Sequence, residues 1–183
     1  MLDVAHVSSD LRRLSPGTIA AGLLVVATSV ILAALAFEHI GGYTPCPLCL
    51  QQRYAYYLGI PALAAALAAL HIRRPQAAAG ILLAVGLGFV INAGLGTYQA
   101  GAEWKFWDPP DTCSSAGDLP TFDLKSMNVD KLPASCGVAS WRFLGLSFAG
   151  WNAVTSAGLA GGALLAALKA SGKSGWPAPR SAG

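Results

Sequence analysis

Four long apolar runs constrain the fold of this chain more than any other feature of its sequence. They extend from about Gly17 to Phe37, Leu50 to Leu70, Gln76 to Tyr98 and Phe143 to Leu168. Each is close to the roughly 20 residues that an α-helix needs to cross a bilayer. Only 11% of the residues are charged, against about 25% in a soluble domain. The sequence therefore predicts an all-α membrane protein, with four transmembrane helices in a bundle that forms a single membrane domain over residues 1–183.

Clusters of basic residues predict how the bundle is oriented. They precede the first run, separate the second from the third, and follow the fourth: Arg12, Arg13; Arg73, Arg74; Lys169, Lys173, Arg180. If the chain crosses four times, these clusters share one side, which the positive-inside rule assigns to the cytoplasm. Both termini are therefore expected in the cytoplasm, and the polar tail 171–183 is expected to be disordered. Because the basic residues form no continuous stripe, no nucleic-acid partner is expected.

All four cysteines fall on the opposite side of the membrane in this topology. Cys46 and Cys49 open the second run, while Cys113 and Cys136 lie in a long loop predicted over residues 99–142. In a bacterium that side is the periplasm, where disulfides persist. The chain is thus expected in the bacterial inner membrane with its cysteines on the periplasmic face. Four cysteines allow two disulfides in three connectivities, and the spacing alone does not choose between them.

The segment Cys46-Pro47-Leu48-Cys49 has the spacing of a redox pair or of half a zinc site. Pro47 suits the first position of a helix, and the free N–H groups at a helix start stabilise a thiolate. Arg53 lies four residues after Cys49 and so shares its helical face. Arg53 is therefore a candidate to stabilise the Cys49 thiolate or to bind a polar oxygen of a ligand in the lipid phase. Its alternative role is a cation that anchors the helix at the membrane surface.

Two other interpretations of the cysteines stay open at this point. Both pairs could be inert disulfides that staple external loops, which would make the protein a scaffold and not an enzyme. A zinc site built from all four cysteines is the second alternative. The Cys113 and Cys136 spacing is not Cys-x-x-Cys, and His39 is the only histidine on the external side. No metal site is therefore predicted.

Three segments together resemble the bacterial disulfide bond formation protein B (DsbB) family. They are Cys46-Pro-Leu-Cys-Leu-Gln-Gln-Arg53, Tyr98-Gln-Ala-Gly-Ala-Glu-Trp104, and Trp141-Arg-Phe-Leu-Gly-Leu-Ser147 with Ala149-Gly-Trp-Asn152 beyond it. The resemblance extends from about Phe37 to Val154 and includes the four-helix topology. The chain departs from the family pattern at Gly137, where relatives often have an acidic residue, and at Gln99, where some have a histidine.

This resemblance implies a protein thiol oxidase that passes electrons to ubiquinone or menaquinone. A loop disulfide between Cys113 and Cys136 would oxidise a periplasmic thioredoxin-fold dithiol protein of the DsbA kind, with Cys113 forming the mixed disulfide. Cys136 would then exchange with Cys46, and Cys49 would deliver the electrons to the quinone. The implied catalytic residues are the four cysteines, and the implied quinone-binding residues are Cys49 and Arg53. Vitamin K epoxide reductases have a similar bundle, but their redox pair lies late in the chain.

Overall fold

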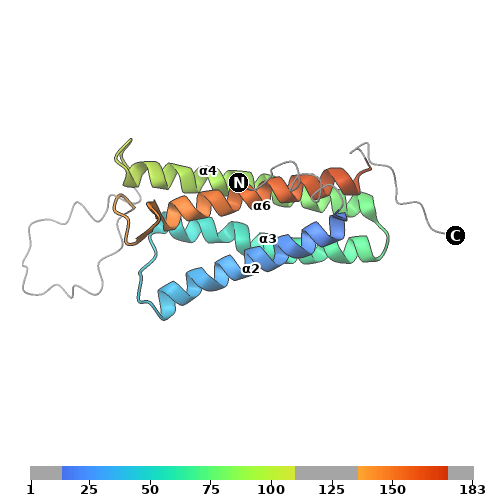
Figure 1. Ribbon diagram of the computed structural model, residues 1–183, viewed down its shortest axis with the longest axis horizontal. Coiled ribbons are helices and arrows are strands. Elements are labelled where there is room, and N and C mark those ends of the chain that lie inside the picture. The colour runs from blue at the N-terminus through green and yellow to red at the C-terminus, as the bar shows by residue number, and fades with distance from the viewer. Residues whose placement is uncertain (1–13, 110–135, 173–183) are drawn as a thin grey trace, which may run out of the picture.

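The computed structural model describes residues 14–109 and 136–172 and contains four long helices in these ranges. They are α2 (Pro16–His39), α3 (Pro47–His71), α4 (Pro75–Glu103) and α6 (Phe148–Ala170) (Figure 1). All four are long and apolar enough to cross a membrane, which confirms the predicted four-helix membrane bundle. The sides on which the termini and the long loop lie stay predictions. Cys113 and residues 173–183 of the predicted tail lie outside the described residues.

Two helix boundaries differ from the sequence prediction. α4 continues beyond Tyr98 to Glu103, so the first residues assigned to the long loop are helical. This last turn is buried by the rest of the bundle, which the sequence pattern does not reveal. α6 starts at Phe148 and not at Phe143, because residues 142–147 form a hairpin of β1 (Arg142–Phe143) and β2 (Leu146–Ser147). The two turn residues, Leu144 and Gly145, both have positive φ, at 52° and 83°, as a tight type I′ hairpin requires.

Side-chain caps and prolines explain where the four long helices begin. The side chains of Ser15, Cys46 and Ser147 each accept a hydrogen bond from a backbone N–H in the first turn of α2, α3 and α6. A proline follows two of these caps and also opens α4. Its fixed φ and missing N–H suit the first helical position. The cap of α3 is thus a cysteine of the predicted redox pair.

Glycines allow α4 and α6 to approach closely, and Figure 1 shows the two helices side by side along much of their length. A Cβ on Gly96 would lie 3.0 Å from the Ala149 carbonyl oxygen and 3.0 Å from the Ala153 nitrogen. A Cβ on Gly86 would lie 2.8 Å from the Leu164 side chain. Such close backbone contact is the usual way in which helices associate in lipid.

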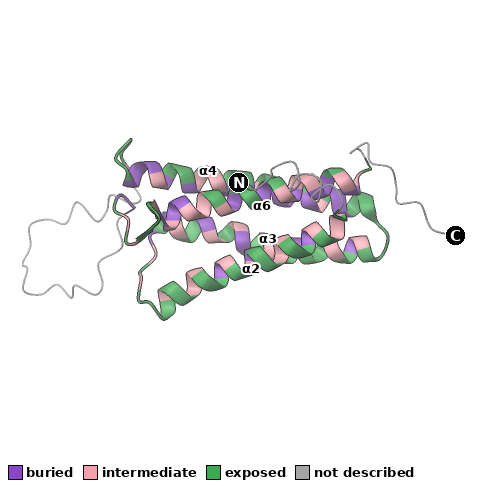
Figure 2. Cartoon of the chain, viewed as in Figure 1, coloured by how far each residue is buried: buried purple, intermediate pink, exposed green. Residues whose placement is uncertain are grey.

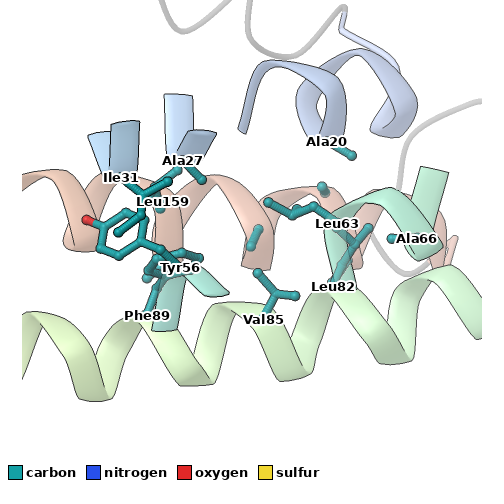
Figure 3. Close-up of a cluster of buried hydrophobic side chains, with 14 residues drawn as sticks. Ala20, Ala27, Ile31, Tyr56, Leu63, Ala66, Leu82, Val85, Phe89 and Leu159 are labelled. Atoms are coloured by element: carbon teal, nitrogen blue, oxygen red, sulfur yellow. The ribbon is translucent and has the colours of Figure 1, made fainter. Parts of the chain in front are cut away.

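The core runs along the axis of the bundle, and its widest side chains are Tyr56 and Phe89 (Figure 3). Their rings meet edge to face with centroids 5.3 Å apart. Tyr56 is only 2% exposed. Its ring fills the core, and its hydroxyl finds polar partners on α6. The outer faces of the helices consist mostly of exposed residues (Figure 2). Apolar side chains such as Val25 and Leu58 are among them.

Candidate functional site

α2 diverges from the other helices at one end of the bundle (Figure 1). The residues at this end line a cavity of about 420 Å³. Its walls come from the second half of α2, the start of α3, the end of α4, the β1–β2 hairpin and the start of α6. Most of the lining is apolar. The polar groups that reach it include both cysteines of α3, together with Gln52, Arg53, Gln99 and Glu103. The cavity therefore places the predicted redox pair against an apolar space.

Cys46 and Cys49 are both free thiols in this structure. Cys46 is 3% exposed and its Sγ accepts the Cys49 backbone N–H at 3.2 Å. Cys49 is less deeply buried. The pKa of the Cys46 thiol is raised, first by its side-chain hydrogen bond with Cys49 and then by burial. Cys46 is therefore the member of the pair that keeps its proton, and Cys49 is the better candidate for a thiolate.

Cys136 lies beside this pair although it is far from it in the sequence. Cys136 is disulfide-bonded, and it forms one buried cluster with Cys46 and Leu48, against which Cys49 packs. A cysteine in a disulfide offers no thiolate to a zinc ion, which argues against the four-cysteine zinc site. The structure thus brings together three of the predicted site cysteines, while Cys113 lies outside the described residues.

Gln99, on the last turns of α4, contacts both sulfurs of the pair. Its Nε2 lies 3.3 Å from the Cys46 Sγ and 3.3 Å from the Cys49 Sγ. Its Oε1 accepts a hydrogen bond from Gln52 Nε2 at 2.7 Å. Because that oxygen is already occupied, the N–H groups of Gln99 are turned toward the sulfurs. An N–H donor in this position favours a negatively charged sulfur.

A chain of hydrogen bonds from α6 holds this amide arrangement. Asn152 Nδ2 donates to Gln52 Oε1 at 2.5 Å, and the Tyr56 hydroxyl donates to Asn152 Oδ1 at 2.7 Å. Deeper in the bundle, Asn92 Nδ2 donates to Ser156 Oγ at 2.9 Å. Satisfied polar networks of this kind fix the relative positions of packed helices. Gln52 and Asn152 were not predicted as site residues, although both lie in segments that resemble the DsbB family.

Arg53 lines the same cavity as Cys49, and its guanidinium forms an ion pair with Glu38 at the end of α2. The two side chains are 13% and 25% exposed. Within the described ranges, no hydrogen bond joins Arg53 to the Cys49 sulfur. Glu38 was not predicted as a site residue, because nothing in the sequence shows that the end of α2 faces the first turns of α3. The pair satisfies a cation that would be costly near a bilayer.

Aromatic rings form one wall of the cavity, and they come from three separate segments: Phe37, Tyr43, Trp141, Phe143, Phe148 and Trp151. Trp141 stacks on Phe148 with centroids 4.9 Å apart. Phe37 meets Phe148 edge to face at 5.0 Å. Trp141 thus lies in the wall of the cavity. A wall of this kind suits a flat, apolar ring.

Comparison with known proteins identifies the family. A family profile described as Disulfide bond formation protein DsbB matches residues 16–166. Disulfide bond formation protein B of Xanthomonas euvesicatoria is 39% identical over 158 residues, which cover 82% of this chain and 85% of the relative. The protein of the same name from Albidiferax ferrireducens is 31% identical over 147 residues, covering 76% and 80%. No solved structure matches the chain. The matched region contains all of α2, α3 and α4 and most of α6. The chain therefore belongs to the DsbB family of disulfide bond formation proteins.

Proposed function

We propose that this protein is a quinone-dependent thiol oxidase of the bacterial inner membrane, with its cysteines on the periplasmic side. It would reoxidise a DsbA-like thioredoxin-fold protein and pass the electrons to ubiquinone or menaquinone. The observation that carries the proposal is the cluster in which the disulfide-bonded Cys136 packs against the free Cys46 and Cys49 at the edge of an apolar cavity. The disulfide that contains Cys136, the Cys46–Cys49 dithiol and a cavity for an apolar ring are thus adjacent.

The first part of the relay concerns the loop disulfide, which we assign to Cys113 and Cys136. Cys113 would accept attack by the thiolate of the partner protein, and Cys136 would leave as a thiolate. Two contacts hold the chain around Cys136 against the end of α4. Lys105 Nζ donates to the Gly137 carbonyl oxygen at 2.9 Å, and Arg142 lies 3.5 Å from the Glu103 carbonyl oxygen. These contacts support direct exchange between Cys136 and Cys46.

The second part concerns Cys46 and Cys49. Oxidation of the two thiols to a disulfide releases two electrons and two protons. Cys49 is the proposed electron donor, since the Cys46 thiol keeps its proton while the amide of Gln99 points its N–H groups at the sulfurs. The start of α3 adds a favourable field for negative charge at this sulfur.

The lining of the cavity fits a quinone. Its volume of about 420 Å³ lies in the usual range for small-molecule sites, and its aromatic wall matches a flat ring. Arg53 is the proposed ligand of a quinone oxygen, because a guanidinium carries five N–H groups and Glu38 occupies only part of them. When bound, the quinone supplies the two-electron acceptor. Arg53 and the aromatic wall would hold it in the cavity that Cys49 also lines.

The test uses the detergent-purified protein with a short-chain quinone and two different reductants. One is a reduced DsbA-like protein, and the other is dithiothreitol, which is small enough to reduce Cys46–Cys49 directly. We expect wild type to reduce the quinone with both. Cys113→Ser/Cys136→Ser should lose the reaction with the protein reductant and keep it with dithiothreitol, whereas Cys49→Ser should lose both. Quinone reduction by Cys49→Ser at the wild-type rate would refute the proposal.

A further inference from the structure

The proposed reaction releases protons, and the two cysteines cannot hold these protons themselves. Each time Cys46 and Cys49 form a disulfide, two protons leave the thiols and must be held before they reach the electron acceptor. The cavity is mostly apolar, so a proton released there needs a specific base. The ionisable side chains that line it, besides the two cysteines, are Glu38, Tyr43, Arg53, Tyr56 and Glu103.

Most of these groups are unsuited to the task. Glu38 is engaged by the permanent cation of Arg53. The Tyr56 hydroxyl is engaged as the donor of a hydrogen bond to Asn152 Oδ1 at 2.7 Å, and the hydroxyl of Tyr43 already carries a proton and offers no carboxylate-like base. The remaining group is the carboxyl of Glu103.

Glu103 is the last residue of α4 and is only 8% exposed. Its Oε1 lies 3.4 Å from Gln99 Nε2, the same nitrogen that contacts both sulfurs. Its Oε2 has no hydrogen-bond partner, and within residues 14–109 and 136–172 it is the only buried side-chain oxygen or nitrogen in that state. A buried polar atom without a partner is costly, and such exceptions in a structure call for a reason. A proton taken up by the carboxylate on Oε2 would remove this cost.

The charges around Glu103 leave this oxygen available. Lys105 directs its ammonium to the Gly137 carbonyl oxygen. Arg142 approaches the backbone oxygen of Glu103 and not its carboxyl. Arg53, the cation inside the cavity, is held by Glu38. No ion pair fixes the Glu103 carboxyl among the described residues, so its Oε2 is open to a proton donor.

We propose that Glu103 is the proton acceptor for oxidation of the Cys46–Cys49 dithiol, which rests on the proposed function. As the sulfur–sulfur bond forms, two electrons pass from the thiols to the quinone. The proton of the Cys46 thiol moves to the Glu103 carboxylate, and the proton of the Cys49 thiol passes directly to the quinone as the quinone is reduced. Both protons finally join the reduced quinone, so that Glu103 ends each cycle as it began. Its Oε2 is the atom that carries the proton.

The test is the rate of dithiol oxidation by a short-chain quinone in a single turnover, followed across pH in wild type, Glu103→Gln and Glu103→Asp. General acid–base catalysis contributes typically about 10²-fold or more. We therefore expect Glu103→Gln to slow oxidation by about that factor and to lose the fall in rate toward low pH. Glu103→Asp keeps the carboxyl and should recover much of the rate. Circular dichroism confirms that each variant is folded.

Alkylation of Cys49 by iodoacetamide, without quinone, separates proton transfer from a simple effect on the thiolate. We expect Glu103→Gln to alkylate at least as fast as wild type, because a negative neighbour is removed. Unchanged oxidation in Glu103→Gln overturns the proposal, and so does a parallel loss of oxidation and alkylation. A wild-type protein that does not reduce quinone at all refutes the proposed function instead.

Discussion

Replacement of Gly96 by alanine tests whether the close approach of α4 and α6 holds the site together. The added Cβ would lie 3.0 Å from the Ala149 carbonyl oxygen, 3.0 Å from the Ala153 nitrogen and 3.1 Å from its Cα. All three are backbone atoms of α6, which cannot rotate away as a side chain can. The two helices must therefore separate by a few tenths of an ångström locally.

The size of the effect follows from two opposing terms. Overpacking costs typically about 1–3 kcal/mol, while replacing a helical glycine by alanine favours the helix by roughly 0.5–1 kcal/mol. Gly94 lies on the same helix and has no atom within 4 Å of an added Cβ. Gly94→Ala thus carries only the favourable term. Gly96→Ala should be less stable than Gly94→Ala by about 1–3 kcal/mol.

The same change should disturb the amide network. Gln99 follows Gly96 by about one turn, and Asn152 lies on α6 between the two alanines that the new methyl group contacts. The 2.5 Å hydrogen bond from Asn152 to Gln52 spans α6 and α3 and should lengthen when α6 moves. The assay is unfolding in detergent, followed by circular dichroism, with the rate of Cys49 alkylation as a second readout. Equal stability of Gly96→Ala and Gly94→Ala would refute the packing argument.

Two further predictions concern the residues that surround the pair. Glu38→Ala and Arg53→Ala should each lower the free energy of unfolding, because breaking a partly buried ion pair leaves one charge without its partner. The double variant should lose at least about 1 kcal/mol less than the sum of the two single losses. Additive losses of unfolding free energy would show that the pair is not coupled. Gln99→Leu should slow Cys49 alkylation about tenfold, since a hydrogen bond to a charged group contributes about 1.5 kcal/mol. Thr97→Val, which removes an exposed hydroxyl bonded to Ala93, is its control and should alkylate at the wild-type rate.

The sequence predicts the four helices well because length and apolar composition decide whether a segment can cross a bilayer. The start of α3 was also predictable, since Pro47 and the Cys-x-x-Cys spacing both indicate a helix start. The end of α4 was not. Its last turn contains Gln99 and Glu103, which have the polarity of a loop, and their burial depends on partners from other helices.

The contacts that shape the site could not be predicted from the sequence, for the same reason. Gln99 meets Cys46 across 53 positions of the chain, and Glu38 meets Arg53 across a change of helix. The local periodicity of a sequence does not show which residues of different helices are in contact. The hairpin before α6 was missed because the turn at Leu144 and Gly145 lies inside a run that is apolar enough to read as a helix. What could be predicted was the chemistry of the cysteines, and what could not was the set of residues that surrounds them.

The most direct test of the account is the stoichiometry of a single turnover. The fully reduced protein is mixed anaerobically with excess short-chain quinone, quinol is measured by its ultraviolet absorbance, and the disulfides are then mapped by mass spectrometry of alkylated peptides. We predict one quinol for each Cys46–Cys49 disulfide formed in the Cys113→Ser/Cys136→Ser variant, which contains no other cysteines. Consumption of quinone without that disulfide, or no consumption at all, would contradict the account.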